Sequence, residues 1–216
     1  MNRISLTLLG IVLAGASLLD LSSAEAVMGN GDTLTITEGV GGFVQPAPGT
    51  GSWFAMEALG PGGWVYTGIG GATPGGPGIV LGSAQAAPTI DNGWTFFGNT
   101  GWHETDQTVD HPMAVGGDSV DMSGWYVKWG TPVGHFNMGA GADSIMHSGD
   151  EVVTANVVGS AYSLDYAAVV PADSKSFANV PYRLHLEGTV VPEPMSMALV
   201  GSSLIGLIGL RRRLMA

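Results

Sequence analysis

Glycine and proline recur along this chain at intervals that are too short for long helices. The 216 residues include 35 glycines and 12 prolines, which separate short runs of apolar and β-branched side chains. Proline ends a helix or a central strand, and glycine supplies the backbone conformations that tight turns need. No stretch between residues 27 and 190 repeats apolar residues every 3.6 positions for long. We therefore predict an all-β domain in which helices are minor.

Several of the short runs alternate between apolar and polar residues, as half-buried strands do. The run 125–129 places both of its tryptophans on one face. We expect 162–170 and 182–187 to form a hairpin-like pair, joined by 171–181. Further strands are predicted at 32–37, 52–58, 94–97 and 151–158. About eight to ten strands of this kind predict an antiparallel β-sandwich, of which the jelly roll is one form.

Acidic residues dominate the charge of the chain, which is formally −11 at pH 7. Fifteen aspartates and glutamates between residues 27 and 190 are accompanied only by Lys128, Lys175 and Arg183. Because nucleic-acid binding requires a basic surface, we expect no nucleic-acid partner. The chain has no cysteine, which excludes thiol catalysis and thiolate metal sites. No motif indicates a cofactor, and we expect none.

The first 26 residues have the organisation of a secretory signal peptide. A positively charged start precedes a largely apolar stretch over residues 4–19. Ala24 and Ala26 supply the small side chains that signal peptidase reads before it cuts. We therefore expect a signal helix within residues 1–26, passage through the Sec translocon, and a mature domain of residues 27–190 that begins at Val27. A first membrane helix that is not cleaved is the alternative.

Residues 191–216 combine three parts in a fixed order. The tetrapeptide Val191-Pro192-Glu193-Pro194 is an extended spacer, because neither proline can continue a helix or a strand ladder. Residues 195–210 carry no charge and would span about 24 Å as a helix, close to the roughly 30 Å of a membrane hydrocarbon core. Three consecutive arginines follow, and their charge favours a cytoplasmic location for the C-terminal end of this stretch. We therefore predict a single transmembrane helix over 195–210.

The residues that define this pattern are Pro192, Glu193, Pro194, Arg211, Arg212 and Arg213, with a glycine- and leucine-rich helix between them. The arrangement resembles the PEP-CTERM sorting signal of Gram-negative bacteria. The resemblance implies recognition by exosortase, a membrane-embedded cysteine peptidase, and cleavage near Pro194. It also implies transfer to the cell surface or to an exopolysaccharide matrix. An ordinary C-terminal membrane anchor is the alternative.

The segment from Trp102 to Pro112 holds two histidines and three acids, a density that can mark a metal site. The candidate ligands are His103, Asp106, Asp110 and His111. In an extended strand the histidines point to one side and the acids to the other, so no four ligands converge locally on one ion. The glycine of an EF-hand loop is also absent. We interpret the segment as a solvated loop or edge strand, with a divalent-ion site as the alternative.

Six tryptophans are many for a domain of this size. Alternation predicts that Trp125 and Trp129 are buried, whereas Trp64 and Trp102 follow glycines and are predicted to be exposed. Exposed indole rings offer flat apolar faces on which sugar rings stack. An exopolysaccharide-binding module that uses Trp64 and Trp102 is therefore one alternative function.

No catalytic constellation is recognisable in the sequence. The G-x-S-x-G turn of many hydrolases is absent, and paired acids such as Asp118 and Asp121 fall in predicted turns. We therefore expect a non-enzymatic protein that is exported to the cell surface or the extracellular matrix. A metal-assisted hydrolase that uses the segment 103–111 is the second alternative.

Overall fold

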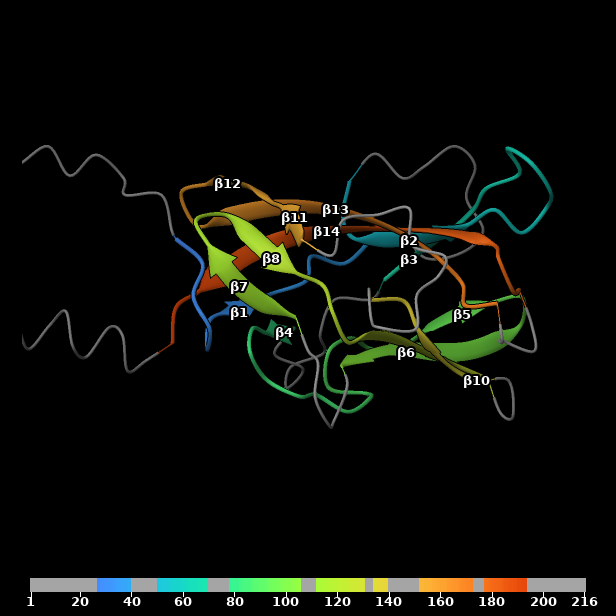
Figure 1. Cartoon of the computed structure of the whole chain (residues 1–216), viewed down its shortest axis with the longest axis horizontal. Helices are drawn as coiled ribbons and strands as arrows, with labels where there is room; N and C mark the ends of the chain where they lie inside the picture. The colour runs from blue at the N-terminus through green and yellow to red at the C-terminus, as the bar shows by residue number, and fades with distance from the viewer. Residues whose placement is uncertain are drawn as a thin grey trace, which may run out of the picture.

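The computed structural model describes residues 27–39, 50–69, 78–105, 112–130, 134–139, 152–172 and 177–193. These ranges contain strands and turns but no helix (Figure 1), which confirms the predicted all-β class. The strands are β1 (Thr33–Leu34), β2 (Trp53–Met56), β3 (Val65–Gly68), β4 (Ile79–Val80), β5 (Trp94–Phe96), β6 (Asn99–Thr105), β7 (Met113–Gly116), β8 (Ser119–Asp121), β9 (Trp125–Trp129), β10 (Gly134–Asn137), β11 (Val152–Thr154), β12 (Asn156–Val158), β13 (Ala161–Val169) and β14 (Pro181–Val191).

Both predicted targeting helices, in residues 1–26 and 195–210, lie outside the described ranges. The described part of the chain contains no helix that is long and apolar enough to cross a membrane. The two helices therefore stay predictions.

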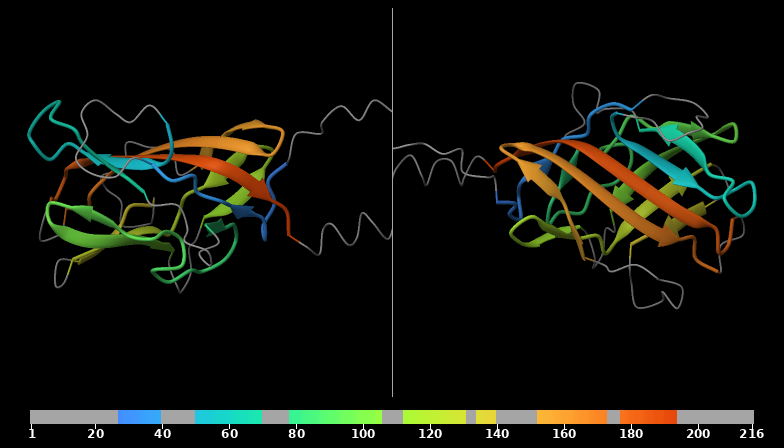
Figure 2. Two further views of the ribbon diagram at one scale, coloured as in Figure 1. Left: turned by 180° about the vertical axis from the view of Figure 1, so that it is seen from behind. Right: turned by 90° about the horizontal axis from the view of Figure 1, so that it is seen from above.

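The largest sheet is organised around β14, which is 11 residues long. Its strand order is β12-β13-β14-β1-β4, and β2 also pairs with β14 and carries β3. The first half of β14 pairs with β2, and its last two residues pair with β1. All of these pairs are antiparallel, and the sheet curls into a half-barrel (Figure 2).

The pair β13–β14 is the most extensive in this sheet, because its register includes all 9 residues of β13. Leu164 and Leu184 face the core and are 1% exposed, whereas Asp165 and Arg183 beside them are exposed. This inward and outward alternation follows from the period of two along a strand. The predicted hairpin-like pair is confirmed.

A four-stranded sheet, β10-β9-β6-β5, lies below the layer of β13, β14 and β2 in Figure 1, and a three-stranded sheet has the order β11-β8-β7. In β9 the side chains of Trp125, Val127 and Trp129 are buried and Lys128 is exposed. The alternation in the sequence predicted this arrangement correctly.

Two segments differ from the expectation. Residues 102–105 belong to β6, which lies between β9 and β5 inside its sheet and is neither a loop nor an edge strand. Polar residues are tolerated there because they bond within the protein; the hydroxyl of Thr105, for example, accepts from the Gln85 amide at 2.5 Å. The run 151–158 divides at Ala155, whose amide donates to the Asp118 carbonyl, so that β11 and β12 join different sheets.

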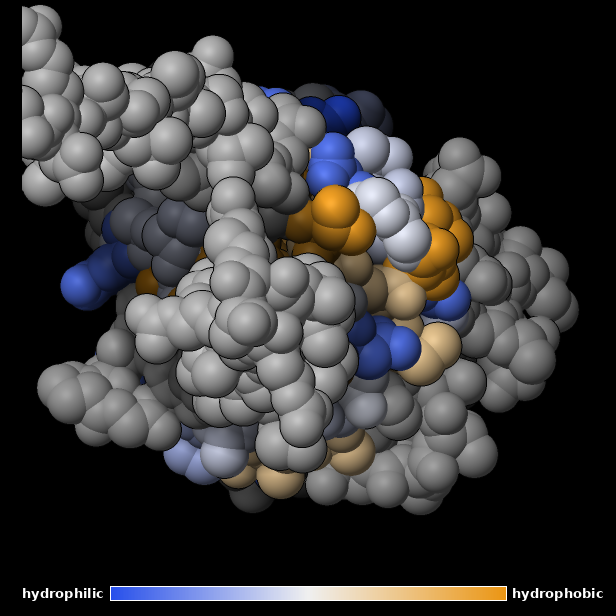
Figure 3. All heavy atoms as spheres, turned by 90° about the vertical axis from the view of Figure 1, so that its left-hand side faces the viewer, coloured by the Kyte–Doolittle hydropathy of each residue, from blue (hydrophilic) through white to orange (hydrophobic). Residues whose placement is uncertain are grey.

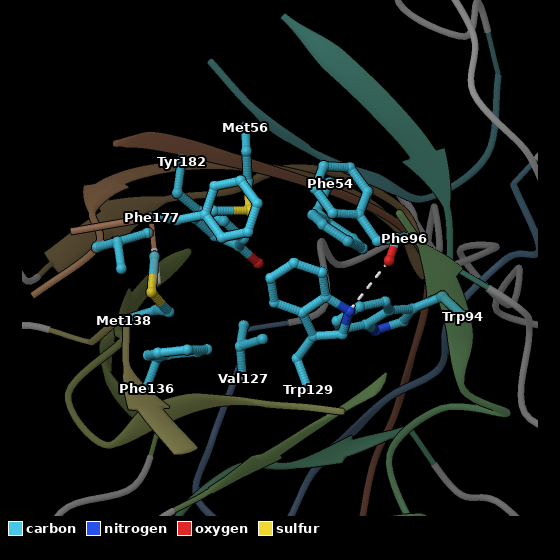
Figure 4. A pocket seen from close by; sticks show the side chains of 11 residues that line it. Phe54, Met56, Trp94, Phe96, Val127, Trp129, Phe136, Met138, Phe177 and Tyr182 are labelled. Carbon is cyan, nitrogen blue, oxygen red and sulfur yellow. Dashed lines mark hydrogen bonds between the residues drawn. The ribbon is translucent and has the colours of Figure 1, made fainter. Parts of the chain in front are cut away.

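Aromatic side chains fill the space between the two larger sheets. The ring of Phe54 on β2 lies 4.5 Å from that of Trp94 and 5.2 Å from that of Phe96, measured between centroids. Figure 4 shows these rings around a small gap in the core, near the hydrogen bond from Trp129 to the Phe96 carbonyl. The gap has a volume of about 10 Å³, roughly that of one water, and it is therefore a packing defect too small for an organic ligand.

Replacing Phe54 by alanine should destabilise the domain by about 3–5 kcal/mol, because the ring is 1% exposed and its removal leaves a cavity between the sheets. The matched control is Leu59→Ala at a side chain that is 66% exposed, for which about 0.5 kcal/mol or less is expected. Urea unfolding followed by tryptophan fluorescence measures both. Equal effects of the two changes would contradict the assignment of Phe54 to the core.

Candidate functional site

The two ends of the described chain lie side by side (Figure 1). Thr33 pairs with Val191 and Leu34 with Val190, at the end of β14. The Glu193 amide donates to Asp32 Oδ1 at 3.0 Å, just beyond this pair. Figure 3 looks at this end, where the described residues in view mix hydrophobic and hydrophilic side chains.

The structure therefore places part of the predicted sorting motif directly at the end of the longest strand. Pro192 is exposed and Glu193 is half-buried there. The other predicted targeting residues lie outside the described ranges, and these are Ala24, Ala26, Pro194, Arg211, Arg212 and Arg213.

A second group of side chains lies on the outer face of the large sheet, away from the core. The register aligns Trp53 of β2, His185 of β14 and Asp165 of β13 in one row across three strands. Phe54, which follows Trp53, points into the core, so that the row itself points outward. We call this group the outer cluster, and its members are Trp53, Trp64, Tyr66, Asp165, Arg183, His185 and Glu187.

His185 is bonded on both sides of its ring. Nδ1 lies 2.7 Å from Asp165 Oδ1, and Nε2 lies 3.1 Å from Glu187 Oε1. The ring also stacks on Trp53, with centroids 5.3 Å apart. Glu187 is fixed in turn by the Gly51 amide, which donates to Oε2 at 2.9 Å. The arrangement ties three strands and the turn before β2 together through one imidazole.

Two carboxylates beside one ring favour the charged imidazolium. Burial disfavours the charge, but the hydrogen bonds that the imidazolium donates to Asp165 and Glu187 outweigh it and raise the pKa of His185 above its ordinary 6.5. Hydrogen bonds from His185 and the Gly51 amide lower the pKa of Glu187 below its ordinary 4.5. His185, Asp165 and Glu187 therefore form an ion-pair network when the imidazole is protonated.

Aromatic rings extend the outer cluster along the sheet. Tyr66 meets Trp53 edge-on, with centroids 5.1 Å apart. The guanidinium of Arg183 lies 4.4 Å from the centre of the Trp64 ring, which is cation–π geometry. Together these side chains place three aromatic rings and the Arg183 guanidinium on one face of the sheet, beside the His185 network.

The two tryptophans predicted as sugar-stacking residues do not form one site. Trp64 immediately precedes β3 in the large sheet, whereas Trp102 lies on β6 in the four-stranded sheet. Both are half-buried. Trp102 covers the turn at Gly93, where an added Cβ would stand 2.5 Å from the indole nitrogen. Trp102 is therefore packed against its own sheet, and only Trp64 belongs to the outer cluster.

His103, the first predicted metal ligand, is enclosed in the core at 0% exposure. Its Nδ1 lies 2.6 Å from Asp91 Oδ2, and its Nε2 lies 3.2 Å from the Tyr182 hydroxyl. The ring stacks on Trp125 at 4.9 Å. Burial raises the pKa of Tyr182 well above its usual range, so this hydroxyl stays protonated. Because both ring nitrogens already face protein groups, His103 has no free position for a metal.

The remaining predicted ligands, Asp106, Asp110 and His111, lie outside the described ranges. Within those ranges no cluster of three or more histidine, aspartate or glutamate side chains could hold a metal ion.

A further polar group lies on the outer face of the four-stranded sheet. Glu104 contacts the Nε2 atom of His135, and its Oε2 accepts from the Ala87 amide at 3.0 Å. Lys128 Nζ lies 3.9 Å from the same oxygen, and the His135 ring stacks on Tyr126 at 4.4 Å. Glu104 thus links three strands to the segment before β5, which is a structural role.

Sequence reasoning missed His185, Glu187 and Asp165 as site residues. The alternation of His185 and Glu187 with buried leucines was a usable signal, because it places both on the outer face. No local sequence pattern indicates that they contact Asp165 and Trp53, since these residues are brought together by pairing with β13 and β2.

No protein-family model matches the chain, and no curated protein or solved structure matches it. The interpretation of the site therefore rests on its own geometry.

The His185 network should make stability depend on pH. Since the folded state raises the pKa of His185, its contribution is complete below about pH 6.5 and is lost as pH rises through the raised value. The Glu187 contribution has the opposite sign: it is present above about pH 4.5 and is lost on acidification. Because the carboxylates are partly exposed, we expect no more than about 1 kcal/mol between pH 6 and pH 9.

Urea unfolding at several pH values, with wild type and His185→Gln in parallel, measures this dependence. The variant should lose the decline above pH 6.5, and Asp165→Asn should reduce it. An identical slope in wild type and His185→Gln would show that the network does not couple to folding.

Proposed function

We propose that this chain is the precursor of an exported, non-enzymatic protein of the cell surface or extracellular matrix. Its working part is the domain of residues 27–190, which we class as a β-sandwich because two sheets face each other across one core. Residues 191–216 then act as a PEP-CTERM-type sorting signal that exosortase cuts, and residues 1–26 as the secretory signal.

The observation that carries this proposal is the position of the domain's two ends. β1 begins six residues after Val27, and β14 ends at Val191, immediately before Pro192. The pair Thr33–Val191 brings both ends to one edge of the sheet. This supports a domain that is complete between the two predicted cuts and would keep its core after both segments are removed.

The non-enzymatic part of the proposal is supported by the buried His103. A histidine beside an aspartate is typical of general-base pairs, but His103 and Asp91 are 0% and 1% exposed. A general base must reach the proton that it removes. This pair therefore stabilises the core.

The metal-assisted hydrolase that is the alternative can be tested separately. Metal found in the purified protein, together with a melting temperature that falls in chelator, would support it.

The intact mass of the protein recovered from producing cells and medium tests the sorting proposal. We expect a species that begins at Val27 and ends near Pro194, because both segments would be removed on export. A membrane-bound species that retains residues to Ala216 would instead establish a plain anchor and overturn the proposal.

The matched variant replaces Arg211, Arg212 and Arg213 by glutamine. Without these charges the tail is no longer held on the cytoplasmic side, so unprocessed or released precursor should accumulate. If the variant is processed like wild type, the arginines are not part of the signal.

Polysaccharide binding is the second candidate function, and the outer cluster favours it. The guanidinium of Arg183, the one arginine in the described part of an acidic chain, lies over the Trp64 ring, and Tyr66 meets Trp53 edge-on in the same cluster. A sugar ring can stack on an indole, and a guanidinium can bind a sugar carboxylate in a bidentate manner. The ligand class that fits this face best is therefore an anionic polysaccharide.

Gel retardation with alginate as an anionic polysaccharide and dextran as a neutral one tests this binding. Trp64→Ala and Arg183→Ala should each weaken alginate retardation by about tenfold, the loss of one stacking or charge-assisted contact. Trp102→Ala is the matched control, because it removes a half-buried tryptophan from the other sheet and should leave retardation unchanged. Absence of retardation by both polysaccharides would eliminate the outer cluster as a sugar site.

A further inference from the structure

We infer that Asp32 holds the Pro192-Glu193 segment against the domain and thereby sets the rate at which the C-terminal tail is removed. This inference rests on the proposed sorting function and adds its regulation. The interaction is called the Asp32 contact below, and it consists of the hydrogen bonds that Asp32 accepts from Gly29 and Glu193.

Both carboxylate oxygens of Asp32 take part. Oδ1 accepts from the Glu193 amide at 3.0 Å, and Oδ2 accepts from the Gly29 amide at 2.8 Å. The Asp32 residue is only 7% exposed. Hydrogen bonds from backbone amides to a shielded carboxylate are stronger than those between neutral groups. One side chain thus binds both ends of the described chain.

The neighbouring backbone closes around the same point. Gly31 has a φ of +95° and leaves room for the Glu193 side chain; an added Cβ would stand 2.6 Å from Glu193 Oε2. The Asp32 carbonyl accepts from the Leu81 amide at 2.9 Å, and the Gly31 amide donates to the Leu81 carbonyl at 2.8 Å. The segment that carries Asp32 is therefore anchored to the domain through its backbone.

A peptidase needs the residues around its cut in an accessible, extended form. Val190 and Val191, which precede the motif, are paired with β1, and the Val190 amide also donates to the Ser160 carbonyl at 2.8 Å. These residues become available only when the end of β14 separates from β1. Cleavage of a segment that is protected in this way follows the population of the opened state. The Asp32 contact lowers that population.

The contact requires the folded domain. Gly29 lies close after the predicted signal-peptide cut, so the segment that follows residue 26 must be in place before Asp32 can bind both amides. The folded precursor is thus the form in which the Pro192-Glu193 segment is held against the domain. The rate at which the tail is removed then depends on how often the end of β14 separates from β1, and the presence of the motif alone does not set it.

Pulse-chase labelling in the producing cells, with the full-length chain, tests the inference. Asp32→Ala should raise the rate of conversion to the tail-less product by about tenfold, because the opened state gains population when one shielded carboxylate is lost. Asp121→Ala is the matched control: Asp121 also caps a backbone amide, that of Ser123 at 2.8 Å, but it has no contact with Glu193. Its conversion rate should equal that of wild type.

A second readout separates the contact from general destabilisation. Glu193 supplies the one amide proton of the Pro192-Glu193-Pro194 tripeptide, because proline has none. Hydrogen exchange of this amide in the detergent-solubilised precursor should be slow in wild type and fast in Asp32→Ala.

The outcomes distinguish the two proposals. Conversion in wild type at the same rate as in Asp32→Ala overturns the regulation and leaves the sorting function standing. Absence of conversion in wild type and in every variant overturns the sorting function and the regulation with it. Fast exchange of the Glu193 amide in wild type overturns the contact itself.

Discussion

The pairing of β14 with three different strands is the constraint on which this structure depends. Its 11 residues are bonded to β13 along one edge and to β2 and then β1 along the other. One strand therefore fixes the register of most of the large sheet. A slip by one residue would turn the buried leucines outward and the charged residues inward, so the alternation along β14 specifies its own register.

The same alternation separates two kinds of chemistry. Inward residues of β14 join a core that tolerates a histidine because Asp91 and Tyr182 bond to both nitrogens of His103. Outward residues form an ion-pair network in which His185 lies between two carboxylates. The buried histidine is bonded and inaccessible, whereas the outer cluster borders solvent. The proposed polysaccharide binding therefore uses the outer face.

The end of β14 connects the fold to the proposed proteolytic processing of the chain. The proposed sorting motif begins where the strand ladder ends, and Asp32 reaches across to bind the Glu193 amide. In this scheme domain stability and processing share one set of contacts, because the opening that exposes the motif also breaks the β1–β14 pair. Under the proposed sorting function, removal of the tail is in this way coupled to folding of the domain.

Local patterns in the sequence determined the all-β class and the inward faces of 125–129 and 162–170, because alternation between buried and exposed side chains can be read from a few adjacent residues. The pairing of the last two strands was also predicted from two such runs that follow each other in the sequence. The sequence also indicated the two terminal segments, which lie outside the described ranges. Only the tertiary structure decided that 99–105 is an interior strand, that 151–158 divides between two sheets, and that Asp32 meets Glu193. These features depend on contacts between residues that are far apart along the chain, and no local pattern encodes which strands become neighbours in a sheet.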